Sequence, residues 1–163
     1  MTVAGCYPGS FDPPTVAHLA VAEAARAHAG LDRLDLVLSR QALGKEGAER
    51  SPLPARVAAL EAVASGRPWL GVAVTEARLL ADVAEGYDVV VMGADKWAQV
   101  VDPAWYGGSE AARDEAVARL PRVLVAPRAG WPVPAGVEVL DLHPDHLDVS
   151  STAAIAGRRD WLL

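Results

Sequence analysis

Short apolar runs of strand length alternate with helix-forming segments along the whole chain, and this alternation is the feature that most limits its fold. The strand candidates are Val3–Tyr7, Leu34–Leu38, Leu70–Val74, Asp88–Met92, Arg122–Ala126 and Val137–Leu142. The helix candidates are Thr15–Ala29, Arg56–Ser65, Glu76–Ala84, Glu110–Leu120 and Ser150–Leu163. Such alternation is typical of a parallel sheet with helices on both faces. We therefore predict an α/β, Rossmann-like doubly wound parallel sheet of about five strands.

The chain has 163 residues and no internal repeat, so we predict a single domain over 1–163. Gln41–Pro54 is polar and rich in Gly and Pro, which predicts a long loop, and Gly93–Asp95 is predicted as a turn. Ligands of doubly wound folds bind beyond the carboxyl ends of the strands. The site is therefore expected in the loops that begin at Gly9, Gly93 and Pro127.

The composition argues against several classes of partner. Lys and Arg total 15 against 21 Asp and Glu, the formal net charge is −6, and no basic block stands out. A nucleic-acid partner is therefore disfavoured. No apolar run reaches the roughly 18–20 residues that cross a bilayer, and no signal-like segment opens the chain, so we expect no membrane partner. The lone Cys6 excludes an internal disulfide, which suits a cytoplasmic protein, and a homo-oligomer stays open.

The most informative segment is the predicted turn between the first strand and the first helix. Gly9 lets a backbone approach a phosphate closely, and Ser10 with the following amides can donate to its oxygens. Thr15 and His18 are three residues apart, so they share a face in a first helical turn. A hydroxyl and an imidazole placed there can stabilise charge on a phosphoryl group. The alternative is that Thr15 only caps the helix and His18 is a partly buried structural histidine.

The string Gly-Ser-Phe-Asp-Pro-Pro-Thr-Val-Ala-His, which ends at His18, resembles the G-[ST]-F-D-P-x-[HT]-x-G-H signature of the nucleotidyltransferase superfamily. That superfamily contains the nicotinate/nicotinamide mononucleotide and phosphopantetheine adenylyltransferases, and the latter also have threonine at the place of Thr15. Ala17 replaces the usual glycine. The resemblance implies that His18 and Thr15 are catalytic. It also implies that Gly9, Ser10, Phe11 and His18 bind the nucleotide.

A second resemblance lies near the end of the chain, where two serines and a threonine precede a predicted helix. Alone, Ser150, Ser151 and Thr152 are typical of helix caps. The segment is similar to the superfamily's triphosphate-binding I-S-S-T-x-[IV]-R motif, which implies that these three residues bind nucleotide. Ile155 stands where that motif has arginine. Our hypothesis is that Arg158 or Arg159, about one helical turn onward, supplies the missing charge.

The middle of the chain resembles the acceptor pocket of the mononucleotide adenylyltransferases. The resemblance runs through Val91–Trp97 and Trp105 to Val123–Arg128, and it matches a G-A-D…W…strand-R pattern. It implies that Asp95 accepts hydrogen bonds from the acceptor and that Trp97 or Trp105 stacks on a flat ring. The alternatives are that Asp95 caps a helix and that each tryptophan belongs to the core.

Two basic residues flank the predicted long loop. In the family, a lysine near Lys45 and an arginine near Arg56 bind phosphates, so both are expected to contact substrate. One family feature is missing, because Thr75–Ala84 contains no tyrosine where the bacterial nicotinate mononucleotide enzymes have an aromatic-threonine segment. The acceptor is therefore left open.

The resemblance implies an adenylyltransferase that moves AMP from ATP to a phosphorylated small molecule and releases pyrophosphate. The acceptor that the resemblance implies is nicotinate or nicotinamide mononucleotide, which would place the enzyme in NAD biosynthesis. Mg²⁺ is expected to arrive with ATP rather than at a metal site of the protein. The alternatives are a phosphopantetheine adenylyltransferase, a CTP-dependent cytidylyltransferase, and a nucleotide-binding protein without turnover. A purely structural role is a last alternative.

Overall fold

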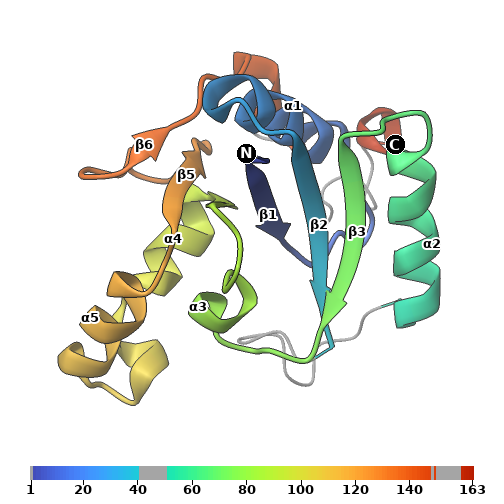
Figure 1. Ribbon diagram of the computed structural model, residues 1–163. Coiled ribbons are helices and arrows are strands. Elements are labelled where there is room, and N and C mark those ends of the chain that lie inside the picture. Colours follow the sequence, from blue (N-terminus) through green and yellow to red (C-terminus); the bar gives the residue numbers. More distant parts are fainter. Residues whose placement is uncertain (1, 41–50, 148, 150–158) are drawn as a thin grey trace.

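The computed structural model describes residues 2–40, 51–147, 149 and 159–163, which form one sheet flanked by helices (Figure 1). The strands are β1 (Ala4–Pro8), β2 (Arg33–Ser39), β3 (Leu70–Thr75), β4 (Val89–Gly93), β5 (Arg122–Ala126) and β6 (Glu138–Val139). The α-helices are α1 (Val16–Ala29), α2 (Leu53–Ala64), α3 (Leu80–Val83), α4 (Ala94–Val100) and α5 (Glu110–Ala118). Short 3-10 helices are η1 (Pro103–Tyr106), η2 (Pro144–His146) and η3 (Arg159–Trp161).

The sheet has the strand order of a doubly wound nucleotide-binding fold. The order is β3-β2-β1-β4-β5-β6, and every strand pair is parallel. The direction in which successive strands are added reverses between β1 and β4, and ligands of such sheets bind at this switch point. The predicted fold class is therefore confirmed, with six described strands rather than about five.

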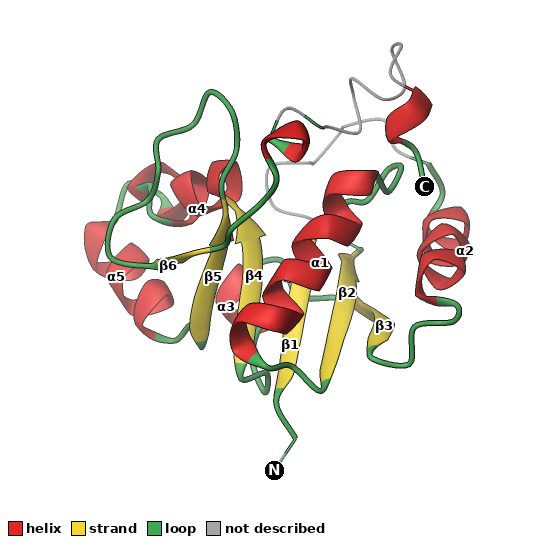
Figure 2. Cartoon of the chain, turned by 90° about the horizontal axis from the view of Figure 1, so that it is seen from above, coloured by secondary structure: helices red, strands yellow, loops and turns green. Residues whose placement is uncertain are grey.

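Helices cover both faces of the sheet, as the alternating pattern predicts. Figure 2 shows α1 in front of the strands and α3 behind them. Successive side chains of β1 belong to two separate hydrophobic cores on opposite faces of the sheet. Tyr7 packs in the core that contains α1 residues such as Val21, whereas Cys6 packs in the core that contains α3 residues such as Leu80. Cys6 is fully buried, and this burial raises the pKa of its thiol to about 12, so it is the inert core residue that its apolar surroundings predict.

The predicted turn at Gly93–Asp95 is wrong, because helix α4 begins at Ala94 directly after β4. Glycine at this junction has a steric reason. A Cβ atom on Gly93 would lie 2.6 Å from the Asp95 carboxylate oxygen. The absence of a side chain therefore allows Asp95, in the first turn of α4, to fold back over the strand end.

Several predicted boundaries also differ. Helix α2 starts at Leu53, before the expected Arg56, because Pro54 is compatible with a first helical turn. Helix α3 covers only Leu80–Val83, since the Thr75 hydroxyl accepts a hydrogen bond from the Ala77 amide and holds a turn there. Strand β6 is limited to Glu138–Val139, where it pairs with Leu124 and Val125 of the short strand β5.

The predicted C-terminal helix Ser150–Leu163 is wrong over its described part. Residues 150–158 lie outside the described residues, and Arg159–Trp161 forms a 3-10 turn. Leu162 then pairs with Thr15 in an isolated antiparallel bridge. The last residues of the chain therefore lie against the start of α1.

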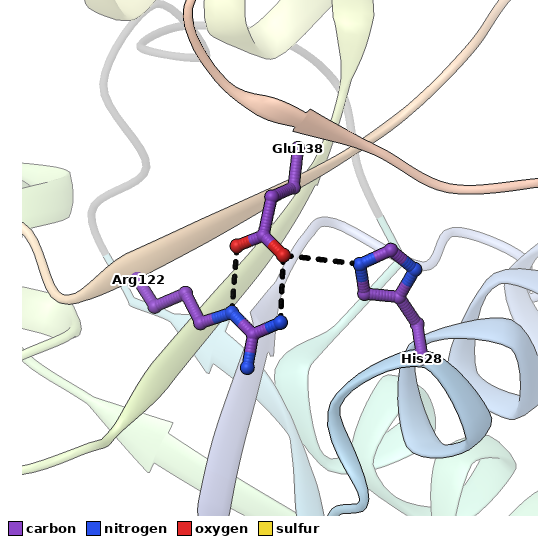
Figure 3. A network of polar contacts seen from close by, with 3 residues as sticks. All are labelled: His28, Arg122 and Glu138. Atoms are coloured by element: carbon purple, nitrogen blue, oxygen red, sulfur yellow. Dashed lines mark hydrogen bonds and ion pairs between the residues drawn. The ribbon is translucent and has the colours of Figure 1, made fainter.

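A three-residue polar network joins edge strand β6 to the amino end of β5 and the last turn of α1 (Figure 3). Two nitrogens of Arg122 donate to the Glu138 carboxylate at 2.6 Å each, and His28 Nε2 lies 3.1 Å from the same group. The hydrogen bonds from Arg122 and then His28 lower the pKa of Glu138 from 4.5 to about 2. The network therefore favours the folded state only while Glu138 is ionised.

Replacing Glu138 with glutamine is expected to flatten the acid limb of the stability curve. Because the folded-state pKa is depressed, the stabilisation is complete above about pH 4.5 and is lost as the pH falls toward about 2. The effect should be small and should shrink in high salt, since the three side chains are partly exposed. Urea unfolding measured from pH 2 to pH 7 checks this, with Glu115→Gln on exposed α5 as the control. Equal acid slopes for wild type and Glu138→Gln would contradict it.

Candidate functional site

The turn between β1 and α1 lies at the carboxyl end of the central strand, beside the switch point. Gly9 is exposed, and its amide donates to the Val37 carbonyl of β2 at 3.1 Å. A Cβ atom on Gly9 would lie 3.0 Å from the Phe11 ring, so glycine lets that ring fold back beneath the turn. Phe11 itself has a φ of 46°, a left-handed conformation that costs energy for a non-glycine residue. This strained turn delivers the chain to Thr15, the N-cap of α1.

His18 is held at the first turn of α1 by the backbone of the N-cap residue. Its Nδ1 accepts a hydrogen bond from the Thr15 amide at 2.8 Å, and the Thr15 hydroxyl lies 3.2 Å from the same nitrogen. A backbone N–H can only donate, so Nδ1 carries no proton. In the neutral imidazole the proton is therefore on Nε2, and no described residue pairs with that atom.

The surroundings of His18 favour this neutral form. Burial and, next, the positive charge of Arg128 lower the pKa of His18 to about 4. The ring is nevertheless partly exposed, and the Phe11 ring meets it edge-on with centroids 4.9 Å apart. His18 is thus a fixed, uncharged N–H donor at neutral pH, and it is not sealed within the core.

An ion pair joins the carboxyl ends of β4, the neighbour of β1, and β5, the neighbour of β4. Arg128 follows β5 and places Nη1 3.4 Å from a carboxylate oxygen of Asp95, at the start of α4. Both side chains are about one-third exposed. Because β1, β4 and β5 are consecutive parallel strands, Arg128 and Asp95 lie at the same edge of the sheet as the turn after β1, and the charge of Arg128 acts to lower the pKa values of both His18 and Tyr7. This region contains a neutral donor, a cation and a carboxylate, which together suit a phosphorylated ligand with hydroxyl groups.

Arg128 belongs to the stretch that resembles the acceptor pocket, but sequence reasoning assigned it no role of its own. The available signal for such a role was its position, two residues beyond the carboxyl end of β5, the strand next to β4. The predicted capping role of Asp95 is not observed, since the N-cap of α4 is Gly93 and no side chain caps that helix.

Thr15 and Phe11 lie behind the exposed part of the site. Thr15 is 1% exposed and Phe11 is 2% exposed. Their contacts are with the His18 ring. In this arrangement both residues orient the imidazole, whereas direct contact with a nucleotide stays a prediction. Gly9 is exposed and Ser10 half-buried, so their backbone can be approached.

Arg56 is connected to the same corner from helix α2. It is 5% exposed, and its Nε donates to the Ser51 carbonyl at 3.0 Å. The Ser51 amide in turn donates to the Asp12 carboxylate at 2.8 Å. Through Ser51, the buried guanidinium therefore supports the turn after β1. Lys45 lies outside the described residues.

The two predicted tryptophans have different surroundings. Trp97 of α4 is half-buried and packs against the core that contains Cys6 and Leu80. Trp105 of η1 is 41% exposed. The structure thus favours the core alternative for Trp97, and it leaves Trp105 accessible for ring stacking.

Ser150, Ser151, Thr152 and Arg158 lie outside the described residues, as does the side chain of Arg159. The described residues on either side can be placed. Before the segment, η2 packs against α1 and the Ala129 amide donates to the Leu147 carbonyl at 3.0 Å. After it, Leu162 pairs with Thr15. Both flanks therefore meet the helix that carries His18.

A hollow of about 500 Å³ lies on the side of α1 that faces α2. Its lining is mostly apolar and consists of Pro13, Pro14, Leu19, Ala59, Ala62, Val63, Arg67, Leu162 and Leu163. A surface of this kind does not suit a polyphosphate. The polar groups at the switch point are the better candidate site.

Comparison with known proteins identifies a family for most of the chain. The model of a family described as cytidylyltransferase-like matches residues 6–157, which includes every strand described above except the first two residues of β1. A comparison with curated proteins found no match. Among the described residues, no helix is long and apolar enough to cross a membrane.

Replacing Arg128 with methionine is expected to raise the pKa of His18 from about 4 toward 6.5. The removed charge disfavours the imidazolium, but burial remains, so 6.5 should not be reached. Titration of ¹⁵N-labelled histidine by NMR measures this shift and also reports the Nε2–H tautomer. Arg119→Met removes a charge that pairs with Asp82 on α3 and serves as the control. A wild-type His18 that titrates near 6.5, or carries its proton on Nδ1, would refute the assignment.

Proposed function

The chain belongs to the cytidylyltransferase-like family and is therefore a nucleotidyltransferase; on that premise, we propose that it transfers AMP from ATP to a phosphorylated small molecule and releases pyrophosphate. The observation that carries the proposal is the hydrogen bond from the Thr15 amide to His18 Nδ1. It directs an N–H donor, rather than a base, toward the carboxyl end of β1. Such a donor stabilises a phosphoryl group without forming a covalent bond to it.

In the proposed reaction, a phosphate oxygen of the acceptor attacks the α-phosphorus of ATP in line, and the bond to the pyrophosphate oxygen breaks. Negative charge then shifts toward pyrophosphate. His18 Nε2–H would hydrogen-bond the transferred phosphoryl group, and Arg128 would offset charge nearby. The amides after Gly9 and the hydroxyl of Ser10 would hold further phosphate oxygens. The protein positions the reactants and stabilises charge, and no residue of the chain acts as a nucleophile.

We expect the segment Ser150–Thr152 to bind the β- and γ-phosphates, as its motif predicts. Mg²⁺ is expected to enter bound to ATP, where it neutralises phosphate charge. Near the site, the Asp95 carboxylate is paired with Arg128. An ion held mainly by substrate oxygens needs few protein ligands.

For the acceptor we propose nicotinate or nicotinamide mononucleotide. Asp95 can accept hydrogen bonds from a ribose, and the exposed Trp105 can stack on a pyridine ring. The Thr75 hydroxyl is engaged with the Ala77 amide, so it offers no obvious replacement for the missing aromatic-threonine segment. A CTP-dependent reaction is the second candidate, since the matching family description is cytidylyltransferase-like.

The proposed reaction is tested by asking which triphosphate and which acceptor the protein uses. Pyrophosphate release is measured with ATP, CTP and GTP, each against nicotinate mononucleotide, nicotinamide mononucleotide and phosphopantetheine. We expect ATP with a pyridine mononucleotide to give the highest kcat/KM. For the active pair, His18→Ala should lower kcat by about 10²- to 10³-fold, the usual cost of losing one transition-state donor.

The control is His143→Ala, which removes an exposed imidazole on the loop before η2. A His18→Ala kcat within twofold of wild type would contradict the assigned role of His18. Tight nucleotide binding without product in every combination would favour the alternative of a binding protein without turnover.

Arg158 and Arg159 are the residues expected to replace the motif arginine that is missing at Ile155. Replacing both Arg158 and Arg159 with methionine should weaken ATP binding about tenfold or more, because hydrogen bonds to charged phosphates are among the stronger ones. Isothermal titration measures the affinity. The matched control replaces Arg33 and Arg119, two cations near the amino ends of β2 and β5, so the net charge changes equally. Unchanged ATP affinity and turnover in the Arg158/Arg159 variant would show that neither residue replaces that arginine.

A further inference from the structure

Tyr7 lies beside Phe11 and His18 at the end of β1, yet neither motif assigns it a role. It is the penultimate residue of β1, and its side chain lies on the face of the sheet covered by α1. Its ring meets Phe11 edge-on with centroids 5.2 Å apart, and the His18 ring centroid is 6.2 Å away. Tyr7 is only 8% exposed. The phenol ring therefore forms part of the support beneath His18.

The hydroxyl of Tyr7 differs from those of the other two tyrosines. Tyr87 donates to the Asp35 carboxylate at 2.7 Å, and Tyr106 donates to the Val100 carbonyl at 2.9 Å. Tyr7 forms no hydrogen bond with any residue in the described part of the chain. The Tyr7 hydroxyl is not among the described buried side-chain atoms that lack a partner, so it keeps access to the surface of the site. A bound ligand can therefore reach this hydroxyl and accept a hydrogen bond from it.

The charges around Tyr7 define what kind of ligand fits. Burial and then the carboxylate of Asp95 raise the pKa of Tyr7 far above its usual range, and Arg128 opposes this shift. The hydroxyl consequently stays protonated at every working pH and acts as a donor. The nearby Arg128 attracts an anion to the same place. An anionic ligand rich in acceptor oxygens, such as a phosphoryl group, satisfies both residues.

We propose that the Tyr7 hydroxyl donates a hydrogen bond to a non-bridging oxygen of the phosphoryl group transferred, next to the oxygen bound by His18 Nε2. This assignment rests on the proposed nucleotidyl transfer. The two donors come from different elements, β1 and α1, and their rings are neighbours, with centroids 6.2 Å apart and planes tilted by 60°. Tyr7 thus binds and orients the reacting group, and it transfers no proton.

Tyr7→Phe tests the proposal, because it removes the hydroxyl and keeps the ring that packs against Phe11. For the active substrate pair, kcat/KM should fall about tenfold while the melting temperature and the shape of the pH profile stay unchanged. Tyr106→Phe is the matched control, since its hydroxyl bonds the Val100 carbonyl at the end of α4. A Tyr7→Phe enzyme with kcat/KM within twofold of wild type would overturn the assignment.

A sulfur substitution separates binding from a merely structural role. Sulfur accepts hydrogen bonds weakly, so one diastereomer of ATP with sulfur on the α-phosphorus should react almost equally with wild type and Tyr7→Phe. Equal losses for ATP and for both thio diastereomers would mean that Tyr7 acts through the fold, and this would overturn the proposal. The comparison still holds if Tyr7→Phe lowers the melting temperature, because each enzyme is its own reference.

Failure of the proposed function can be distinguished from failure of the Tyr7 assignment. If the wild-type protein turns over no triphosphate, nucleotidyl transfer fails, and Tyr7 is then tested by titration with inorganic tripolyphosphate. Several-fold weaker binding by Tyr7→Phe, but not by Tyr106→Phe, would support phosphoryl recognition at this hydroxyl. Equal affinities would overturn it.

Discussion

The hydrogen bond from the Thr15 amide to His18 Nδ1 is the interaction on which the rest of the site depends. The first amides of a helix have no partner within the helix, and a side chain three residues after the N-cap commonly reaches back to satisfy one of them. Here that side chain is an imidazole. The same bond that completes the helix start also decides which ring nitrogen carries the proton. Local helix stability and the orientation of the N–H donor are therefore inseparable.

The charge state of His18 follows from its neighbours in the same way. A protonated His18 would be repelled by Arg128 and poorly solvated beside Phe11. The site thus combines a permanent cation with a neutral donor. These serve different purposes: a cation attracts the polyphosphate at a distance, whereas a fixed N–H is most useful when charge on one oxygen grows. In the proposed function, a chain with a net charge of −6 binds an anion because these groups converge locally.

The sequence was sufficient to predict the fold class, because continuous apolar strands and intervening helices are local signals. It also predicted that Thr15 and His18 would meet, since their spacing decides this once a helix starts there. It did not predict that Thr15 would be buried, which depends on the pairing of Leu162 with its backbone. The roles proposed for Arg128 and Tyr7 could not be assigned from the sequence for a related reason. These roles depend on the strand order, which places the carboxyl ends of β1, β4 and β5 together.

The predicted elements that were wrong lie where long-range contacts override local preference. Gly93 reads as a turn residue, but its missing Cβ makes room for the Asp95 carboxylate within a helix start. The Val137–Leu142 run has a strand pattern, but only Glu138 and Val139 pair with β5. Neither outcome can be derived from the segment alone, because each depends on a contact formed only when the sheet assembles.

Arginine is paired differently at the two ends of the sheet, and this difference supports the proposed location of the site. At the amino end, Glu138 is bound by Arg122 at 2.6 Å and also by His28, so little capacity remains for a ligand. At the carboxyl end, Arg128 meets Asp95 through a longer contact of 3.4 Å, with both groups partly exposed. A phosphate can compete with one distant carboxylate far more easily than with a short bidentate pair. Arg128 is therefore the arginine that an incoming anion can bind, and it lies in the same region as His18, whose orientation is fixed by α1.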